Sequence, residues 1–231
     1  MQSIVLLHGA IGAASQLQTL ANALSGRYAV HTINFTGHGG TPMPEGPFSM
    51  ELFAGQVLDY LEQHQLQSPI VFGYSMGGYV GMYIARHHPG KISRLITLAT
   101  KWQWDEAIAA KQQRLFDAAL ILEKSPAFAQ QLEKMHAPND WKELLSRTGA
   151  MLTALGASNT LSMEDYPQVQ TPSLIMQGDK DRMVSLEETL AVYRALPAGS
   201  LCILPDTNHP LESADLRWLV SLISGDRGGN N

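Results

Sequence analysis

Six short apolar segments, most of them uninterrupted, recur along the 231 residues and are separated by longer segments with a helical repeat. Strands covered by helices on both faces carry such uninterrupted apolar runs, whereas half-exposed strands alternate apolar and polar residues. The predicted strands are residues 4–7, 29–35, 70–73, 94–99, 173–177 and 200–204. Because strands and helices alternate, the expected fold class is α/β, with an all-parallel six-stranded sheet flanked by helices.

The helical segments between the strands place apolar residues on one face. In residues 14–24 this face carries Leu17, Leu20 and Leu24, and in residues 49–65 it carries Phe53 and Leu61 among others. Ser49 is the expected N-cap of the second helix.

One interval departs from this rhythm. About 70 residues separate the fourth strand from the fifth, far more than the roughly 4–6 residues of a usual connection. Apolar and aromatic residues at helical spacing predict helices over 105–124, 127–134 and 141–155. We therefore expect a core formed by residues 1–100 and 167–231 and an inserted helical cap, or lid, formed by residues 101–166. The tail, residues 225–231, is expected to be frayed.

Composition excludes several classes of protein. The net charge is −5, which gives no basic footprint, so we expect no nucleic-acid partner. No apolar stretch reaches the ~18 residues of a membrane span. The absence of a leader before residue 4 and the single cysteine, Cys202, which is expected to be a core thiol, favour a cytoplasmic location. A homodimer is compatible with the sequence.

The sequence Gly73–Tyr74–Ser75–Met76–Gly77 follows the third strand and precedes a helical pattern. A G-x-S-x-G segment in this context holds a serine on a sharp strand-to-helix turn, where side chains at the glycine positions would collide with backbone. Ser75 is therefore the candidate nucleophile. The alternative is a glycine-rich turn with a buried serine.

A nucleophilic serine needs a base, and the base needs an orienting acid. His209 is the candidate base because it follows the last strand in the loop "PDTNHPLE". Asp179 and Asp181 both follow the fifth strand, and either can supply the acid. His8 is read as structural, and His87 and His88 as solvated residues at a helix end. The remaining histidines are His31, His38, His64 and His136.

Acyl transfer also needs donors for the oxyanion. The backbone N–H of Met76, directly after the nucleophile, is one candidate, and the N–H of Ala10 in the loop after the first strand is the other. No histidine pair has convincing metal-ligand spacing with a carboxylate, so no metal and no cofactor are expected.

Together these motifs resemble the α/β-hydrolase superfamily, and within it the capped branch of small esterases, carbon–carbon bond hydrolases and haloperoxidase-like enzymes. The matching segments are "LLHGAIGAASQL", "NFTGHGGT", "GYSMGGY", "GDKDRMV" and "NHPLE", which appear in family order. The resemblance implies an α/β-hydrolase fold and identifies Asp181 as the acid.

The chain also departs from the family pattern. The first two strands of the family are missing, so the sheet is expected to be reduced. Asn34 and Thr36 replace the usual aspartate and proline of the turn, and neither position is catalytic in the family. Tyr79 stands where the menaquinone-pathway lyases, whose motif is similar, commonly carry arginine.

The loops expected to frame the pocket are mostly apolar. Its candidate residues are Ile11, Trp102, Trp104, Met183, Val184 and Leu211. Because Trp102 and Trp104 are two residues apart, only one is expected to face inward. An apolar pocket suits a neutral acyl or aryl ester. The expected function is therefore a serine esterase of the carboxylesterase type, acting through an acyl-enzyme on a small-molecule ester. A carbon–carbon hydrolase or lyase, or a slow-turnover ligand-binding receptor, is the alternative.

Overall fold

The computed structural model describes residues 1–225, and its strands form one sheet in the order β2-β1-β3-β4-β5-β6, with every neighbouring pair parallel. The strands are β1 (Ser3–Leu7), β2 (Ala29–Ile33), β3 (Ile70–Tyr74), β4 (Arg94–Leu98), β5 (Ser173–Gly178) and β6 (Gly199–Leu204). The predicted six-stranded parallel sheet is thus confirmed. Residues 226–231 of the tail that was expected to fray lie outside the described residues.

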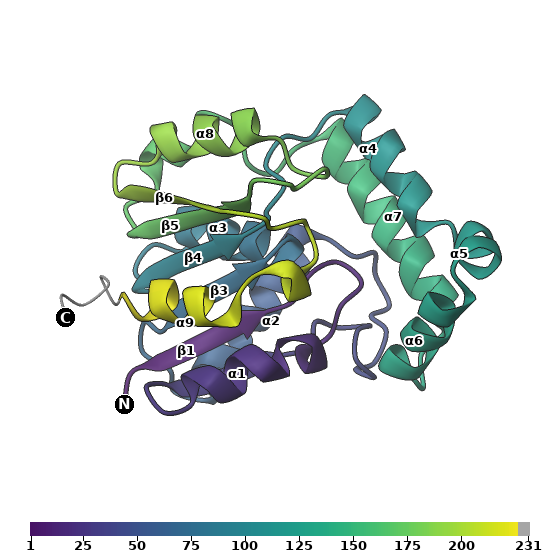
Figure 1. Cartoon of the computed structure of the whole chain (residues 1–231), viewed down its shortest axis with the longest axis horizontal. Helices are drawn as coiled ribbons and strands as arrows, with labels where there is room; N and C mark the ends of the chain where they lie inside the picture. Colours follow the sequence, from purple (N-terminus) through teal and green to yellow (C-terminus); the bar gives the residue numbers. More distant parts are fainter. Residues whose placement is uncertain (226–231) are drawn as a thin grey trace.

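Two helical layers cover the sheet, because successive side chains of a buried strand point to opposite faces. Val5 and Leu7 of β1 pack with side chains of α2 (Met50–Gln63), α3 (Met76–His87) and α8 (Leu186–Ala195). Ile4 and Leu6 pack on the other face with α1 (Gln18–Leu24) and α9 (Leu216–Ser224). In Figure 1, α1 and α9 lie in front of the sheet, and α2 and α3 lie behind it. A 3₁₀ turn, Ala14–Leu17, precedes α1, and the Ser49 side chain caps α2 as predicted, accepting a hydrogen bond from the Leu52 N–H.

The second strand is shorter than predicted and ends at Ile33 instead of residue 35. Asn34 leaves the ladder because its side-chain oxygen accepts a 2.6 Å hydrogen bond from the N–H of Ala14. The N–H of Phe35 donates to the His8 ring at 3.1 Å instead of to a neighbouring strand. The residue that replaces the family's aspartate therefore connects the turn to the loop after β1.

The long interval between β4 and β5 holds α4 (Glu106–Gln113), α5 (Ala118–Lys124), α6 (Pro126–His136) and α7 (Trp141–Ala157). Figure 1 shows these helices together at the end of the sheet toward which the strands run. The prediction of one helix over 105–124 is wrong. A 3₁₀ turn, Arg114–Phe116, interrupts it, and the Asp117 carboxylate then accepts hydrogen bonds from the N–H groups of Ala119 and Leu120, so a new helix starts. That residues 101–166 act as a lid remains a prediction.

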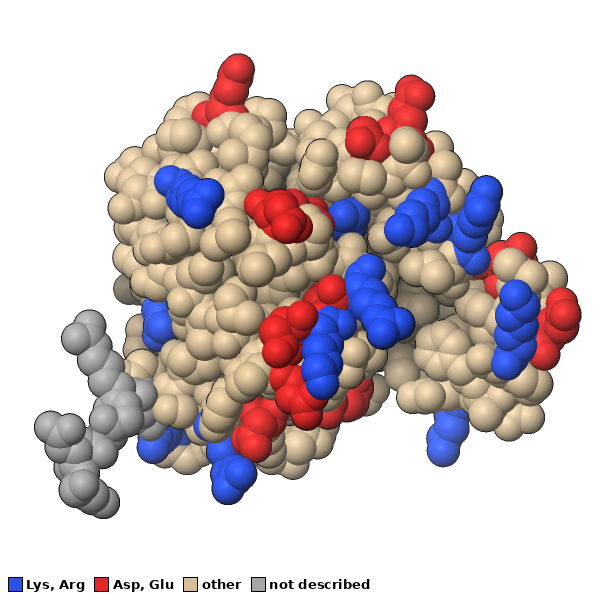
Figure 2. All heavy atoms as spheres, turned by 45° about the horizontal axis from the view of Figure 1, so that its top comes forward, with Lys and Arg blue, Asp and Glu red and all other residues tan. Residues whose placement is uncertain are grey.

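The surface carries both signs of charge. Figure 2 shows lysine and arginine side chains interspersed with aspartate and glutamate over the face in view. Within residues 1–225, no helix combines the length and the apolar character needed to cross a bilayer.

Helix α3 approaches the sheet so closely that glycine is required. A Cβ placed on Gly77 would lie 2.5 Å from the carbonyl oxygen of Leu7 in β1. One placed on Gly73 would lie 2.3 Å from the carbonyl oxygen of Gly77. These obstacles are backbone atoms, which cannot rotate away as a side chain can. The first turn of α3 therefore sits against β1 and β3 only because these residues have no side chain.

We predict opposite effects for two glycine-to-alanine changes. Gly77→Ala should lower the free energy of unfolding by about 2 kcal/mol or more, because the backbone must shift to admit the methyl group. Gly55→Ala, in α2, meets no atom within 4 Å and should raise it by about 0.5–1 kcal/mol, since alanine is the better helix former. Urea unfolding of both variants measures this. Equal effects would contradict the close approach.

Candidate active site

Ser75 lies at the junction of β3 and α3 in a conformation that is unusual for any residue with a side chain. Its φ is 50° and its ψ is −115°. The surrounding backbone holds it there: the Ser75 N–H donates to the Leu98 carbonyl at 2.8 Å, and its carbonyl accepts from the Thr100 hydroxyl at 3.1 Å. Strain of about 1–3 kcal/mol persists only where neighbours fix it in this way. The result is a hydroxyl lifted to the carboxyl end of the sheet.

His209 and Asp181 complete a connected set of side chains with Ser75. The Ser75 Oγ lies 3.4 Å from His209 Nε2, and His209 Nδ1 lies 2.8 Å from Asp181 Oδ2. The other carboxylate oxygen of Asp181 accepts from the N–H groups of Met183 at 2.8 Å and Val184 at 3.0 Å. Both oxygens are therefore engaged, which fixes the carboxylate and, through it, the imidazole.

The pKa of Asp181 reflects competing effects. Burial acts to raise it, but the hydrogen bond and charge of His209, together with the N–H groups of Val184 and Met183, hold the pKa below its ordinary value. The carboxylate is thus ionised at neutral pH, and it favours the tautomer in which His209 Nδ1 carries a proton.

Asp179 has a different environment. Its Oδ1 accepts a 3.1 Å hydrogen bond from the Thr207 N–H, which is the main cause of its lowered pKa. Asp179 is exposed, and its carboxylate bonds to the turn that follows β6. The structure therefore brings Asp181, and not Asp179, to His209.

Tyr74, the residue before the candidate nucleophile, contributes to the position of His209. Its hydroxyl donates to the His209 carbonyl at 3.2 Å, and the two rings lie 5.8 Å apart. Sequence reasoning did not anticipate this contact, because the motif leaves this position unspecified.

A cavity of about 50 Å³ opens beside Ser75 and His209. Ala10 and Met76, whose N–H groups are the candidate oxyanion donors, both line it. Met76 is the first residue of α3, so its N–H has no acceptor within the helix.

Two of the six predicted pocket residues, Trp104 and Met183, line this cavity. The other four lie elsewhere. Val184 is buried beside Asp181, and Leu211 packs in the apolar layer that also contains α1 and α9. Ile11 packs against the apolar cluster of α6 and α7, and the Trp102 ring lies 6.4 Å from that of Tyr79.

Further lining residues were not anticipated from the sequence. They are Met50, Tyr79, Lys101, Gln112, Phe116 and Leu152. Four of them, Lys101, Gln112, Phe116 and Leu152, belong to the helical interval between β4 and β5, and only tertiary packing brings that interval over Ser75. Helical spacing alone does not say which of its residues face a cavity.

Lys101 is the one lysine or arginine among the lining residues, and its charge is compensated. Its ammonium lies 3.0 Å from Oε1 and 3.3 Å from Oε2 of Glu188, a buried residue of α8. The same carboxylate accepts from the N–H groups of Trp102 at 3.1 Å and Gln103 at 2.9 Å. Glu188 therefore anchors the first residues of the helical interval to the core, and little positive charge is left for a ligand.

Three buried histidines hold successive carbonyl groups of the loop after β1. His8 Nδ1 donates to the Gly9 carbonyl at 2.7 Å, and His38 Nε2 lies 2.6 Å from the Ala10 carbonyl. His136, from α6, places Nε2 at 3.1 Å from the Ile11 carbonyl, and its Nδ1 accepts from the Gly39 N–H. Because each peptide plane is rigid, fixing these carbonyls also fixes the N–H groups between them.

These rings are neutral at pH 7. Burial is the largest cause in each case: it lowers the pKa of His38 to about 4, lowers that of His8 well below its ordinary value, and lowers that of His136. His38 faces the Ala10 carbonyl at 2.6 Å and the Thr36 carbonyl at 3.0 Å with one proton to donate. We assign that proton to the shorter contact, at Nε2.

Acid should destabilise the fold through these histidines. A folded pKa below the unfolded value near 6.5 means that unfolding takes up a proton, so the stabilisation is complete above pH 6.5 and is lost as the pH falls toward 4. We expect the free energy of unfolding to drop by about 2 kcal/mol or more between pH 7 and pH 5.

Urea unfolding at the two pH values measures this drop. His38→Gln should make it smaller, whereas His87→Gln, at an exposed position, should leave it unchanged. The same free energy at both pH values would mean that the rings are not buried as neutral groups.

Within residues 1–225, no group of three or more histidine, cysteine, aspartate or glutamate side chains could hold a metal ion. The predicted core thiol, Cys202, is only partly buried, and burial raises its pKa.

Comparison with known proteins agrees with this architecture. Residues 4–220 match the model of the alpha/beta hydrolase family. The chain is 26% identical over 225 residues to the pimeloyl-(acyl-carrier protein) methyl ester esterase of Chromobacterium violaceum, with 89% of this chain and 86% of that protein covered. It is also 26% identical over 228 residues to the Vibrio cholerae protein of that name, covering 90% and 87%.

A solved structure of a hydrolase from Pseudomonas aeruginosa PA01 superposes with a TM-score of 0.79 at 18% identity, covering 99% of this chain and 90% of that one. At that identity the likeness concerns the fold alone. The family match spans nearly the whole chain and confirms the resemblance drawn from the motifs. The chain therefore belongs to the alpha/beta hydrolase family of enzymes.

Proposed function

We propose that this enzyme is a serine hydrolase that cleaves carboxylic esters of small apolar acyl or aryl groups through an acyl-enzyme. The observation that carries the proposal is the run of contacts from Ser75 Oγ to His209 at 3.4 Å and on to Asp181 at 2.8 Å. The first contact is longer than an ideal hydrogen bond, as is common before a substrate is bound. The geometry supports the Ser-His-Asp arrangement of acyl transfer.

In the proposed first half-reaction, His209 Nε2 takes the proton of Ser75 Oγ while Oγ bonds to the ester carbonyl carbon. The carbonyl electron pair moves onto oxygen, and the N–H groups of Met76 and Ala10 stabilise the oxyanion. The tetrahedral intermediate then expels the alcohol oxygen, which receives the proton from His209. Asp181 holds the imidazole in the tautomer that this requires and stabilises its charged form.

In the second half-reaction, water gives a proton to His209 and attacks the acyl-enzyme. The new intermediate collapses, Ser75 Oγ leaves and recovers its proton, and the carboxylic acid is released. The net reaction consumes one ester and one water and needs no cofactor. Three histidines hold the carbonyls of the loop that includes Ala10, which supports a preorganised oxyanion site.

The character of the cavity supports a neutral substrate with a small acyl group. It is largely apolar, and the ammonium of Lys101 is already paired with Glu188. The esterase names of the sequence relatives are consistent with ester cleavage. We also propose that residues 101–166 act as a lid over the site and that the enzyme is cytoplasmic.

The first test is a turnover screen with 4-nitrophenyl esters of increasing acyl length. Wild type should hydrolyse the short esters. Ser75→Ala should lose about 10³-fold or more in kcat while remaining folded, because the covalent route is removed. A fluorophosphonate should label wild type at Ser75. Labelling at another residue, or full activity of the alanine variant, would exclude Ser75 as the nucleophile.

Adding other substrates and a binding measurement to this screen separates the alternative functions. Turnover of a vinylogous diketone or elimination from an acidic substrate without ester turnover would favour carbon–carbon chemistry. Tight ligand binding with a negligible steady-state rate would favour a receptor.

The second test compares two neighbouring aspartates. Asp181→Asn should lose about 10²–10⁴-fold in kcat, because the amide favours the wrong tautomer of His209. Asp179→Asn should cost less than about tenfold and act mainly on stability, at the ~1 kcal/mol scale of a typical substitution. The measurement is the kcat of each variant on one ester, and circular dichroism establishes that both variants fold. The reverse ranking would make Asp179 the acid.

A further inference from the structure

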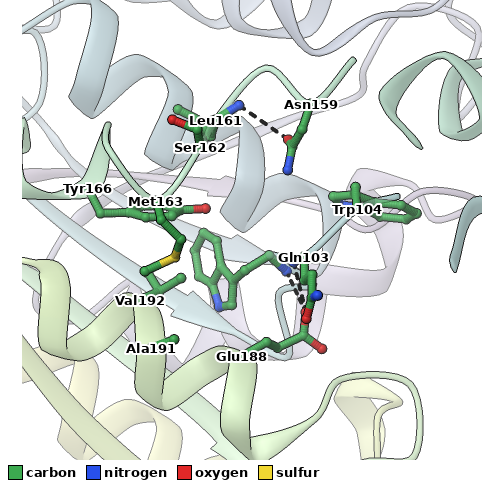
Figure 3. Close-up of a pocket in the computed structure, with 11 residues that line it drawn as sticks. Gln103, Trp104, Asn159, Leu161, Ser162, Met163, Tyr166, Glu188, Ala191 and Val192 are labelled. Atoms are coloured by element: carbon green, nitrogen blue, oxygen red, sulfur yellow. Dashed lines mark hydrogen bonds between the residues drawn. The ribbon is translucent and has the colours of Figure 1, made fainter. Parts of the chain in front are cut away.

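A second, larger cavity lies next to the catalytic one. Its volume is about 300 Å³, whereas the cavity at Ser75 measures about 50 Å³. Figure 3 shows it between the start of the helical interval at Trp104, the segment from Asn159 to Tyr166, and helix α8 with Glu188 and Ala191. Neither Ser75 nor His209 lines it. Its size falls at the lower end of the range of small-molecule pockets, whereas the catalytic cavity alone is far below that range.

Trp104 is the one residue that lines both cavities. Its indole is therefore part of the wall that separates them. The catalytic cavity holds only a few water-sized groups, so an acyl chain of more than a few carbons does not fit within it. Such a chain needs either a route to solvent or a way past this wall.

The wall has a fixed part and an unattached part. Tyr79, which lines the catalytic cavity, is bonded through its hydroxyl to the Asn159 side chain on the other side, and it accepts from the Leu161 N–H at 3.1 Å. The Trp104 indole N–H, in contrast, is buried and has no hydrogen-bond partner among the described residues. The Lys101 ammonium lies 6.0 Å from its ring and is itself paired with Glu188. Displacing Trp104 thus breaks no hydrogen bond of its side chain.

We propose that Trp104 is a movable partition, and that acyl chains too long for the catalytic cavity displace it and extend into the cavity beside α8. This inference rests on the proposed esterase function and deepens it, because it assigns a site for the distal part of the substrate. Trp104 then determines the acyl-length preference.

The chemistry of the larger cavity defines the class of chain that it accepts. Trp102, Leu161, Met163 and Val192 give it an apolar wall. The one carboxylate on that wall, Glu188, is occupied by Lys101 and by two backbone N–H groups. Among the described residues, no lysine or arginine lines it. The expected occupant is an uncharged, largely aliphatic acyl chain of medium length, and a chain that ends in a carboxylate is disfavoured.

The test measures kcat/KM for 4-nitrophenyl acetate and octanoate and uses the octanoate-to-acetate ratio as the readout. Each methylene buried in an apolar cavity is worth roughly fourfold in binding, so several methylenes give a large signal. Trp104→Ala should raise the ratio at least about fivefold by removing the partition. Ala191→Trp, which fills the larger cavity from α8, should lower the ratio about tenfold or more. The double variant Trp104→Ala/Ala191→Trp should lose the gain of the single Trp104 change.

Glu187→Trp is the matched control, because it adds the same side chain at an exposed position of α8 that does not line the cavity. It should keep the wild-type ratio. Ala191 is itself exposed, so Ala191→Trp should fold and decides the question even if Trp104→Ala does not fold. An unchanged ratio in Ala191→Trp, or a gain that persists in the double variant, would overturn the inference. Absence of turnover of either ester by wild type would instead count against the proposed function.

Discussion

The site depends first on the strained backbone of Ser75. A φ of 50° at a residue with a side chain is unfavourable by itself, and it is maintained by hydrogen bonds to β4 and to Thr100 and by the close approach of α3 to the sheet. That approach needs glycine at 73 and 77, since any Cβ there would overlap backbone atoms. The same turn lifts the hydroxyl toward His209 and starts the helix whose first N–H belongs to Met76. The candidate nucleophile and a candidate oxyanion donor thus result from one backbone feature.

The loop after β1 is held in a different way, by three histidine side chains. His8, His38 and His136 each approach one of three consecutive carbonyls; His8 belongs to the loop itself, His38 to the turn after β2 and His136 to helix α6. Burial keeps the rings neutral, so each acts as a hydrogen-bond donor without bringing a charge next to the site. Since His136 belongs to the helical interval, the position of that interval and the geometry of the loop are physically connected.

Glu188 makes a second connection of this kind. One buried carboxylate binds Lys101 and the backbone of Trp102 and Gln103, and so fixes the chain where it leaves the core. Trp104 follows this anchor directly, and its indole N–H has no hydrogen-bond partner within residues 1–225. The backbone before Trp104 is therefore anchored, whereas its indole makes no hydrogen bond. This arrangement is compatible with the proposed role of Trp104 as a partition between the small cavity at Ser75 and the larger one.

The sequence by itself determined the sheet, because continuous apolar runs and the helical repeat depend on neighbours close in the chain. It also determined the candidate nucleophile turn, whose glycines follow from local backbone sterics. Positions directly after strands reduced the candidates for the base to His209 and those for the acid to Asp179 and Asp181. These positions left both aspartates open, and the family resemblance pointed to Asp181. The tertiary structure brings Asp181 to His209, whereas Asp179 binds the Thr207 backbone. It likewise decided that Trp104 lines the cavity at Ser75 while Trp102 packs beside Tyr79, and that His136 reaches the loop after β1. These outcomes depend on contacts between residues 23 to 125 positions apart in the chain, for which local periodicity carries no information.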